Sequence, residues 1–239
     1  MYWYIPWQTR PVFNTLAVQV TDAFNPLDKR HLGESVAGAL LRQPPGPLPP
    51  TGPFVGAGVY AIYYTGNFRP YRPLALRNRE KHEESPIYVG KAVPPGARKG
   101  GFGLGIEPGP ALFSRLREHA QSIKQTDELK IQDFYCRYLV ADDIWIPLGE
   151  ALLIERFQPL WNVLIEGFGI HTPGAGRKKQ VRSKWDTLHP GRGLAADLPP
   201  NPKTASELSR LIADFFTGKA VPKIPTTAAV IEEEQEAGE

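Results

Sequence analysis

Residues 58–65 read Gly58-Val59-Tyr60-Ala61-Ile62-Tyr63-Tyr64-Thr65, a run of β-branched and aromatic side chains between glycines. Such a run predicts a β-strand, and residues 86–90 and 134–140 predict two more. Helices are expected at 111–124, where leucines recur at helical spacing, and at 148–157, before Pro159. The order strand, strand, helix, strand, helix indicates an α+β protein with a small, mostly antiparallel, three-stranded sheet flanked by helices.

The segments on either side of this core have different compositions. Residues 1–53 are expected to form an N-terminal arm with a helix at 32–41 and a proline-rich linker at 44–53. The core is assigned to 54–165, and a basic extension with a helix at 205–216 to 166–230. Residues 231–239 form an acidic tail that is expected to be disordered.

Charge and cysteine content narrow the class of protein. The 239-residue chain has a net charge of +3, but its last nine residues carry five glutamates, so the rest carries +8. The excess lies in residues 69–100 and 166–192, which suits a polyanionic partner such as nucleic acid, although basic surfaces without such a partner are common. Cys136 is the sole cysteine, which excludes a disulfide framework and a Cys-rich zinc module. The sequence shows neither a secretory signal nor an apolar run long enough for a membrane span, so a cytoplasmic protein is expected.

Several polar residues occur where burial is expected. Glu150 lies near the start of an apolar helix, where it could bind a metal or simply stabilise the helix dipole. Arg115 and His119 are four residues apart on one helix face. Arginine could clamp a phosphate and histidine could move a proton, but both could also belong to an ordinary solvated face.

Three further residues are ambiguous when taken singly. Tyr60 and Tyr88 each lie near a glycine of a strand and could be ordinary strand tyrosines. Asn162 follows Pro159-Leu160-Trp161 and could merely cap the chain after the helix.

Taken together and in order, these residues resemble the GIY-YIG nuclease superfamily. The resemblance rests on Gly58-Val59-Tyr60, Tyr88-Val89-Gly90, the Arg115 and His119 pair, and the segment from Glu150 to Asn162. It spans residues 58–162 and implies the GIY-YIG fold. It also implies catalytic roles for Tyr60, Tyr88, Arg115, His119, Glu150 and Asn162.

Finer features are similar to the type II restriction endonucleases of this superfamily that cut the palindrome CCGCGG. These features are the histidine four residues after Arg115, the N-terminal arm and the basic C-terminal extension. The resemblance implies double-stranded DNA as substrate, a homodimer and a functional pairing with a DNA methyltransferase. One departure is that 28 residues separate Tyr60 from Tyr88, whereas most of the superfamily joins them by a short hairpin.

The resemblance also implies a mechanism. Glu150 would hold one divalent ion, Mg²⁺ with Mn²⁺ as a substitute, and Arg115 would contact the scissile phosphate. Either Tyr60 or His119 would be the general base. DNA binding is expected from basic residues of the insertion, of the loop after the second strand, and of the extension: Arg69, Arg72, Arg77, Lys91, Arg98, Lys99, Arg177, Lys178, Lys179 and Arg182.

Two other functions remain open at this point. One is a homing or repair-type nuclease of the same superfamily, although such enzymes usually carry separate DNA-binding modules. The other is a non-catalytic DNA-binding module built on the same core.

Overall fold

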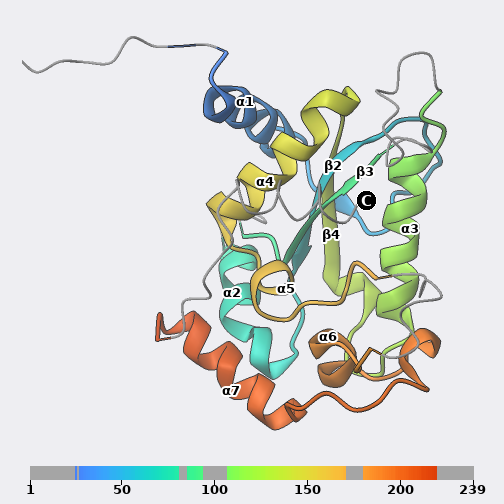
Figure 1. Cartoon of the computed structure of the whole chain (residues 1–239), viewed down its shortest axis with the longest axis vertical. Coiled ribbons are helices and arrows are strands. Elements are labelled where there is room, and N and C mark those ends of the chain that lie inside the picture. The colour runs from blue at the N-terminus through green and yellow to red at the C-terminus, as the bar shows by residue number, and fades with distance from the viewer. Residues whose placement is uncertain (1–24, 26, 81–84, 94–106, 171–179, 220–239) are drawn as a thin grey trace, which may run out of the picture.

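The computed structural model describes residues 25, 27–80, 85–93, 107–170 and 180–219 (Figure 1). Over these residues it contains a sheet of four strands in the order β1 (Gly46–Pro47), β4 (Phe134–Val140), β2 (Gly58–Tyr64) and β3 (Tyr88–Ala92). Every neighbouring pair is antiparallel. The predicted α+β class is therefore confirmed, and the three strands expected from the sequence are present.

The fourth strand corrects the expected strand count. Gly46 and Pro47 lie opposite Cys136 and Tyr135 at the edge of the sheet, inside the segment interpreted as a linker. A proline is tolerated at a sheet edge because it lacks only a donor that an edge position does not need. Two residues carry no alternating pattern, so this strand depends on non-local pairing.

The two faces of the sheet pack against different helices. Tyr60, Ile62 and Tyr64 of β2 share one core with α3 (Ala111–Lys124). Val59, Ala61 and Tyr63 point the other way, into a second core with α1 (Lys29–Leu41) and α4 (Ile146–Phe157). Figure 1 shows α1 beside α4 on one side of the sheet and α3 on the other.

The contact between α1 and α4 requires glycine on both helices. A β-carbon at Gly33 would overlap Leu152, and a β-carbon at Gly149 would lie 2.5 Å from Cγ1 of Val36. The helix expected at 32–41 begins at Lys29, after the N-cap Asp28, and packs on α4. Part of the segment 1–53 therefore belongs to the folded body.

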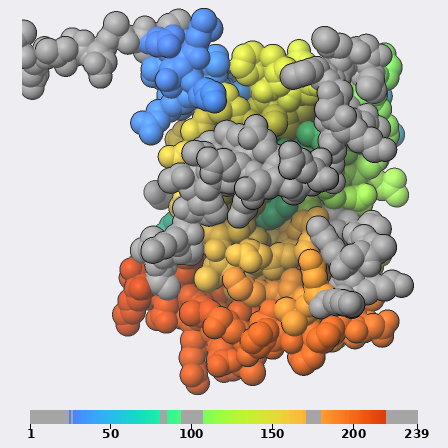
Figure 2. Space-filling view, viewed as in Figure 1, coloured from blue at the N-terminus to red at the C-terminus, as the bar shows by residue number. Residues whose placement is uncertain are grey.

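Four further α-helices lie in the lower half of the view in Figure 1. They are α2 (Arg72–Glu80), α5 (Leu160–Val163), α6 (Lys184–Leu188) and α7 (Ala205–Phe216). The bounds of α7 match the prediction, with Thr204 and Glu207 exchanging capping-box hydrogen bonds. The helix α2 was not expected, and it occupies the insertion between Tyr60 and Tyr88. The segment from α6 to α7 covers the lower part of the surface in Figure 2. None of the helices in the described ranges has the length and apolar character needed to cross a bilayer.

Candidate active site

Tyr60 and Tyr88 lie on adjacent strands and face α3. Tyr60 of β2 is paired with Gly90 of β3, and Ile62 is paired with Tyr88. The two tyrosine rings are 6.2 Å apart between centroids. A β-carbon at Gly90 would collide with the hydroxyl of Tyr60, so glycine at this position makes room for that hydroxyl. This close approach is a physical reason for a strand that reads Tyr-Val-Gly.

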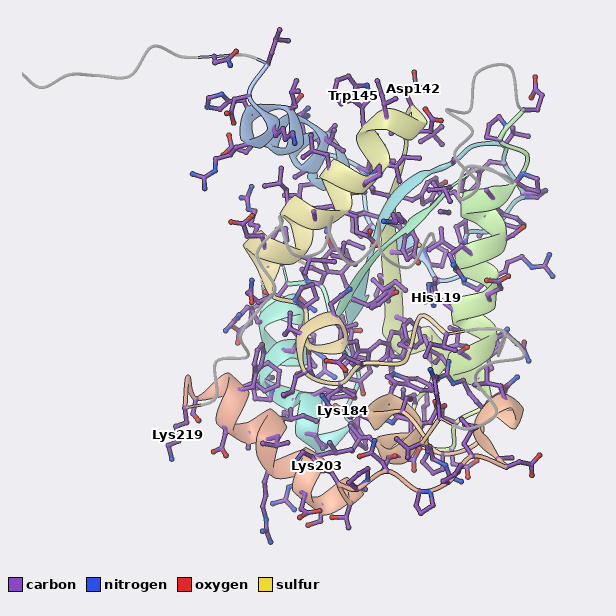
Figure 3. The ribbon with its side chains drawn as sticks, viewed as in Figure 1. His119, Asp142, Trp145, Lys184, Lys203 and Lys219 are labelled. Atoms are coloured by element: carbon purple, nitrogen blue, oxygen red, sulfur yellow. The ribbon has the colours of Figure 1, made fainter. Side chains whose placement is uncertain are left out.

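His119 completes a buried pair with Tyr60. It projects from α3 toward the sheet (Figure 3), and its Nε2 lies 2.6 Å from the hydroxyl of Tyr60. In the tautomer with an unprotonated Nε2, the tyrosine donates this hydrogen bond. Both side chains are inaccessible to solvent. The pair can therefore pass a proton without bulk water between them.

The environment of the tyrosines opposes their ionisation. Burial raises the pKa of Tyr60 well above its ordinary value near 10, and the neighbouring Tyr88 raises it further. Burial, then the charge of Glu150, raises the pKa of Tyr88 to about 12. The charge of Arg115 lowers both values but does not outweigh burial. A free phenolate is therefore disfavoured, and proton transfer must be coupled to an acceptor.

Arg115 lies one helical turn before His119, as the spacing predicted. Its Nη1 is 3.1 Å from Oε2 of Glu118, and a quarter of its side chain is exposed. Because this pair is on the surface, the ion pair holds the guanidinium only weakly. The guanidinium is close enough to act electrostatically on Tyr60 and Tyr88.

Glu150 reaches the same region from α4, on the far side of β3. Its Oε2 is 3.0 Å from Nζ of Lys91, and its side chain is 20% exposed. Its charge raises the pKa of both Tyr60 and Tyr88. The fold therefore brings five side chains together around one end of β3, although they span positions 60 to 150 of the chain. They are Tyr60, Tyr88, Arg115, His119 and Glu150.

Asn162 contacts the backbone of β3. Its Oδ1 accepts a hydrogen bond from the Val89 amide and its Nδ2 donates one to the Val89 carbonyl, both at 2.8 Å. Trp161 donates its amide to the Ile87 carbonyl on the same strand edge. Asn162 and α5 thus take the place of a missing neighbour strand.

The residues predicted to bind DNA fall into four groups. Lys91 is in the site itself, and Arg69, Arg72 and Arg77 are exposed in the short 3-10 helix before α2 and along α2. Arg182 donates to the carbonyls of Ala195 and Ala196, which ties it to the fold of the extension. The rest lie outside the described residues, namely Arg98, Lys99, Arg177, Lys178 and Lys179.

The side chains that could serve as metal ligands suit an ion held by a single carboxylate. No three His, Cys, Asp or Glu side chains in the described part of the chain gather into a metal-binding group. Mg²⁺ is nevertheless commonly bound by one or two carboxylates together with waters and substrate phosphate. The partly exposed carboxylate of Glu150 already faces a cation, the ammonium of Lys91, so its surroundings accept positive charge. These residues fit one divalent ion at Glu150.

One part of the site had no recognisable signal in the sequence. Phe168 and Gly169 lie after the last motif residue, in a segment assigned to the C-terminal extension, yet they contact His119 and Tyr88. A phenylalanine and a glycine in a glycine-rich stretch carry no distinctive pattern, so only the folded structure reveals them.

The antiparallel sheet with tyrosines on two strands, together with arginine and histidine on α3 and glutamate on α4, defines a GIY-YIG nuclease domain. A comparison with protein families supports this class and narrows it. The family model described as the Eco29kI GIY-YIG domain matches residues 52–216. The chain belongs to this family, whose members are nucleases of the restriction-endonuclease type. No curated protein matches the chain in sequence.

Proposed function

We propose that the protein is a type II restriction endonuclease that cuts double-stranded DNA at a palindromic G·C-rich site, with CCGCGG as the expected sequence. The observation that carries this proposal is the contact between Tyr60 and His119 beside Arg115 and Glu150. The pair offers a proton path, Arg115 a positive charge and Glu150 a metal ligand. Together they would activate the attacking water and stabilise the charge of the transition state.

Tyr60 and His119 would activate the attacking water together. As the water oxygen bonds to phosphorus, its proton passes to the Tyr60 oxygen while the Tyr60 proton passes to Nε2 of His119. Neither a free phenolate nor a free hydroxide is formed, which avoids the cost of ionising a buried tyrosine. The bond from phosphorus to the 3′ oxygen breaks, and that oxygen takes a proton from solvent.

The charged residues would stabilise the transition state. Arg115 would donate to a non-bridging oxygen of the scissile phosphate as negative charge accumulates there. Glu150 would hold one divalent ion, either Mg²⁺ or Mn²⁺ as its substitute. The ion would supply Lewis-acid stabilisation of the phosphate and the leaving oxygen. Lys91, which lies 3.0 Å from Glu150, would contribute to contacts with the DNA backbone.

A palindromic site cut on both strands implies two active sites related by a two-fold axis. A homodimer is therefore part of the proposal, as is a partner methyltransferase that protects the host's own sites. Exposed Arg69, Arg72 and Arg77 would contribute to phosphate contacts, so binding should weaken steeply with salt.

Plasmid DNA with known sequence, incubated with the protein and Mg²⁺, tests the proposal. Discrete fragments with ends at one palindrome support it, and mapping those ends shows whether the palindrome is CCGCGG. Scattered nicks, structure-specific cuts or no cleavage would contradict it. Glu150→Ala should abolish cleavage and retain DNA binding in an anisotropy assay, whereas Glu155→Ala, an exposed residue of the same helix, should cleave normally.

A further inference from the structure

Residues 167–170, which we call the strap, pack against His119 and Tyr88 of the active site. The ring of Phe168 is fully buried and stacks on His119, with centroids 4.5 Å apart and planes 18° apart. The same ring meets Tyr88 edge to face at 5.1 Å and 81°. A ring stacked flat on an imidazole limits its rotation, and this rotation sets the direction in which Nε2 points.

Gly169 leaves space for the hydroxyl of Tyr88. A β-carbon at this position would lie 2.5 Å from that oxygen, closer than real β-carbons approach any atom. Every residue other than glycine would therefore displace the hydroxyl or the strap. Gly90 thus makes room for the hydroxyl of Tyr60, and Gly169 makes room for that of Tyr88.

Arg192 holds the strap in place from 22 or more residues downstream. Its Nη1 donates to the carbonyls of Phe168 at 3.1 Å and Ile170 at 2.8 Å, and its Nη2 donates to the carbonyl of Gly167 at 2.8 Å. Three carbonyl groups of the strap are thus held by one planar group.

A buried acid neutralises this arginine. Asp186 accepts from Nε at 2.6 Å and from Nη2 at 2.8 Å, and the guanidinium lies 4.4 Å from the ring centroid of Trp185. A buried charge pair is tolerated only with such complete hydrogen bonding, and this requirement leaves the guanidinium a single orientation. Because the guanidinium has one orientation, the strap carbonyls that it binds are held in one position.

We propose that Phe168 and Gly169 are positioning residues of the nuclease site, and that Arg192 of the C-terminal extension holds them against His119 and Tyr88. The inference rests on the proposed function, since it assigns to the strap the task of aligning the Tyr60 and His119 pair with the attacking water. A misplacement of about 1 Å in such a site can cost about 100-fold in rate.

Two buried phenylalanines provide a matched test. Phe168 and Phe134 both contact the ring of Trp161, but only Phe168 touches His119 and Tyr88. Phe168→Leu should lower the single-turnover rate of DNA cleavage by about 10- to 100-fold, with DNA affinity unchanged. Phe134→Leu should lose a similar amount of thermal stability and cleave at the wild-type rate. Equal rates for the two variants would overturn the proposal.

Two glycines of the C-terminal segment provide a test in which the substitution adds a methyl group and leaves no cavity in the core. Gly169→Ala should slow cleavage by about 10-fold or more, because the new methyl group displaces the Tyr88 hydroxyl. Gly193→Ala is the control, since no atom lies within 4 Å of its β-carbon position. Wild-type rates for both variants would contradict the role of Gly169.

A double-mutant cycle separates positioning from general destabilisation. If Phe168 acts through His119, adding Phe168→Leu to the His119→Ala variant should lower the cleavage rate little further. Fully multiplicative losses would show that the strap acts elsewhere. The wild-type protein distinguishes the two failures: if it cleaves DNA and Phe168→Leu behaves like Phe134→Leu, only the inference is lost. A wild-type protein without cleavage overturns the proposed function, and the strap's catalytic role with it.

Discussion

Asn162 and Val89 are joined by two hydrogen bonds of 2.8 Å, one in each direction, so that a side-chain amide replaces a neighbouring strand. Val89 lies between Tyr88 and Gly90, and Lys91 follows them on the same edge strand. Asn162 therefore fixes the backbone that carries two groups of the active site. Asn162 thereby positions the strand that carries Lys91, and Lys91 forms an ion pair with Glu150, which lies twelve positions before Asn162 in the chain.

Asn162→Ala should weaken both folding and cleavage. It leaves the amide and carbonyl of Val89 without these partners in a partly buried place, which should cost about 2 kcal/mol of unfolding free energy in urea titrations. Cleavage should fall because Tyr88 and Lys91 lose their fixed backbone. Asn201→Ala removes a comparable amide, which bonds Arg182 and Lys203 in the extension, and should reduce stability while leaving the cleavage rate unchanged.

Tyr60→Phe should separate catalysis from packing. Loss of the hydroxyl removes the proton path to His119, so single-turnover cleavage should fall by about 100-fold or more while DNA affinity is retained. Tyr64→Phe, on the same strand and face, removes a hydrogen bond from the Phe68 amide and should change stability alone. Cleavage by Tyr60→Phe at the rate of Tyr64→Phe would exclude the proton path.

The elements with a strong local pattern could be predicted from the sequence. The bounds of α3, β4 and α7 are those expected from periodicity, strand composition and the capping box. The five residues around β3 were proposed as site residues from the sequence, because their order along the chain is distinctive. Their common location could be inferred only through that resemblance, since composition and spacing say nothing about distance in space.

The elements that depend on non-local contacts could not be predicted. The strand β1 exists through its pairing with Cys136 and Tyr135, and α2 lies in an arginine-rich stretch with little apolar pattern. The strap depends on Arg192, whose pairing with Asp186 and three carbonyls has no sequence signature. Asn162 was singled out from the sequence as a candidate catalytic residue, but its contact with the backbone of Val89 is visible only in the fold.

His189 should make the protein less stable as the pH falls. Burial, and then the charge of Arg192, lowers the pKa of His189 to about 3, and the Tyr71 hydroxyl lies 2.6 Å from its Nε2. Below a pH of about 6.5, His189 of the unfolded chain binds a proton, whereas His189 of the folded protein stays neutral. The free energy of unfolding therefore falls by up to about 1.4 kcal/mol for each pH unit. His189→Gln should flatten the slope of unfolding free energy between about pH 6.5 and 4.5.

Two glycines of α1 should respond in opposite directions to the same substitution. At Gly33 the new β-carbon would overlap the end of Leu152 and would also lie 2.8 Å from its Cγ, so the leucine side chain or the helix α4 has to move. We expect Gly33→Ala to lower the unfolding free energy by about 1 to 3 kcal/mol and to reduce cleavage, because the displaced helix α4 carries Glu150. At Gly38 the nearest atom is the tip of Arg42, at 3.3 Å, and alanine is the better helix former, so Gly38→Ala should raise stability by up to about 1 kcal/mol. Because α1 lies outside the residues matched by the family model, equal effects at both positions would show that α1 is a dispensable appendage. Opposite effects would show that the nuclease fold depends on a helix contributed from before its motifs.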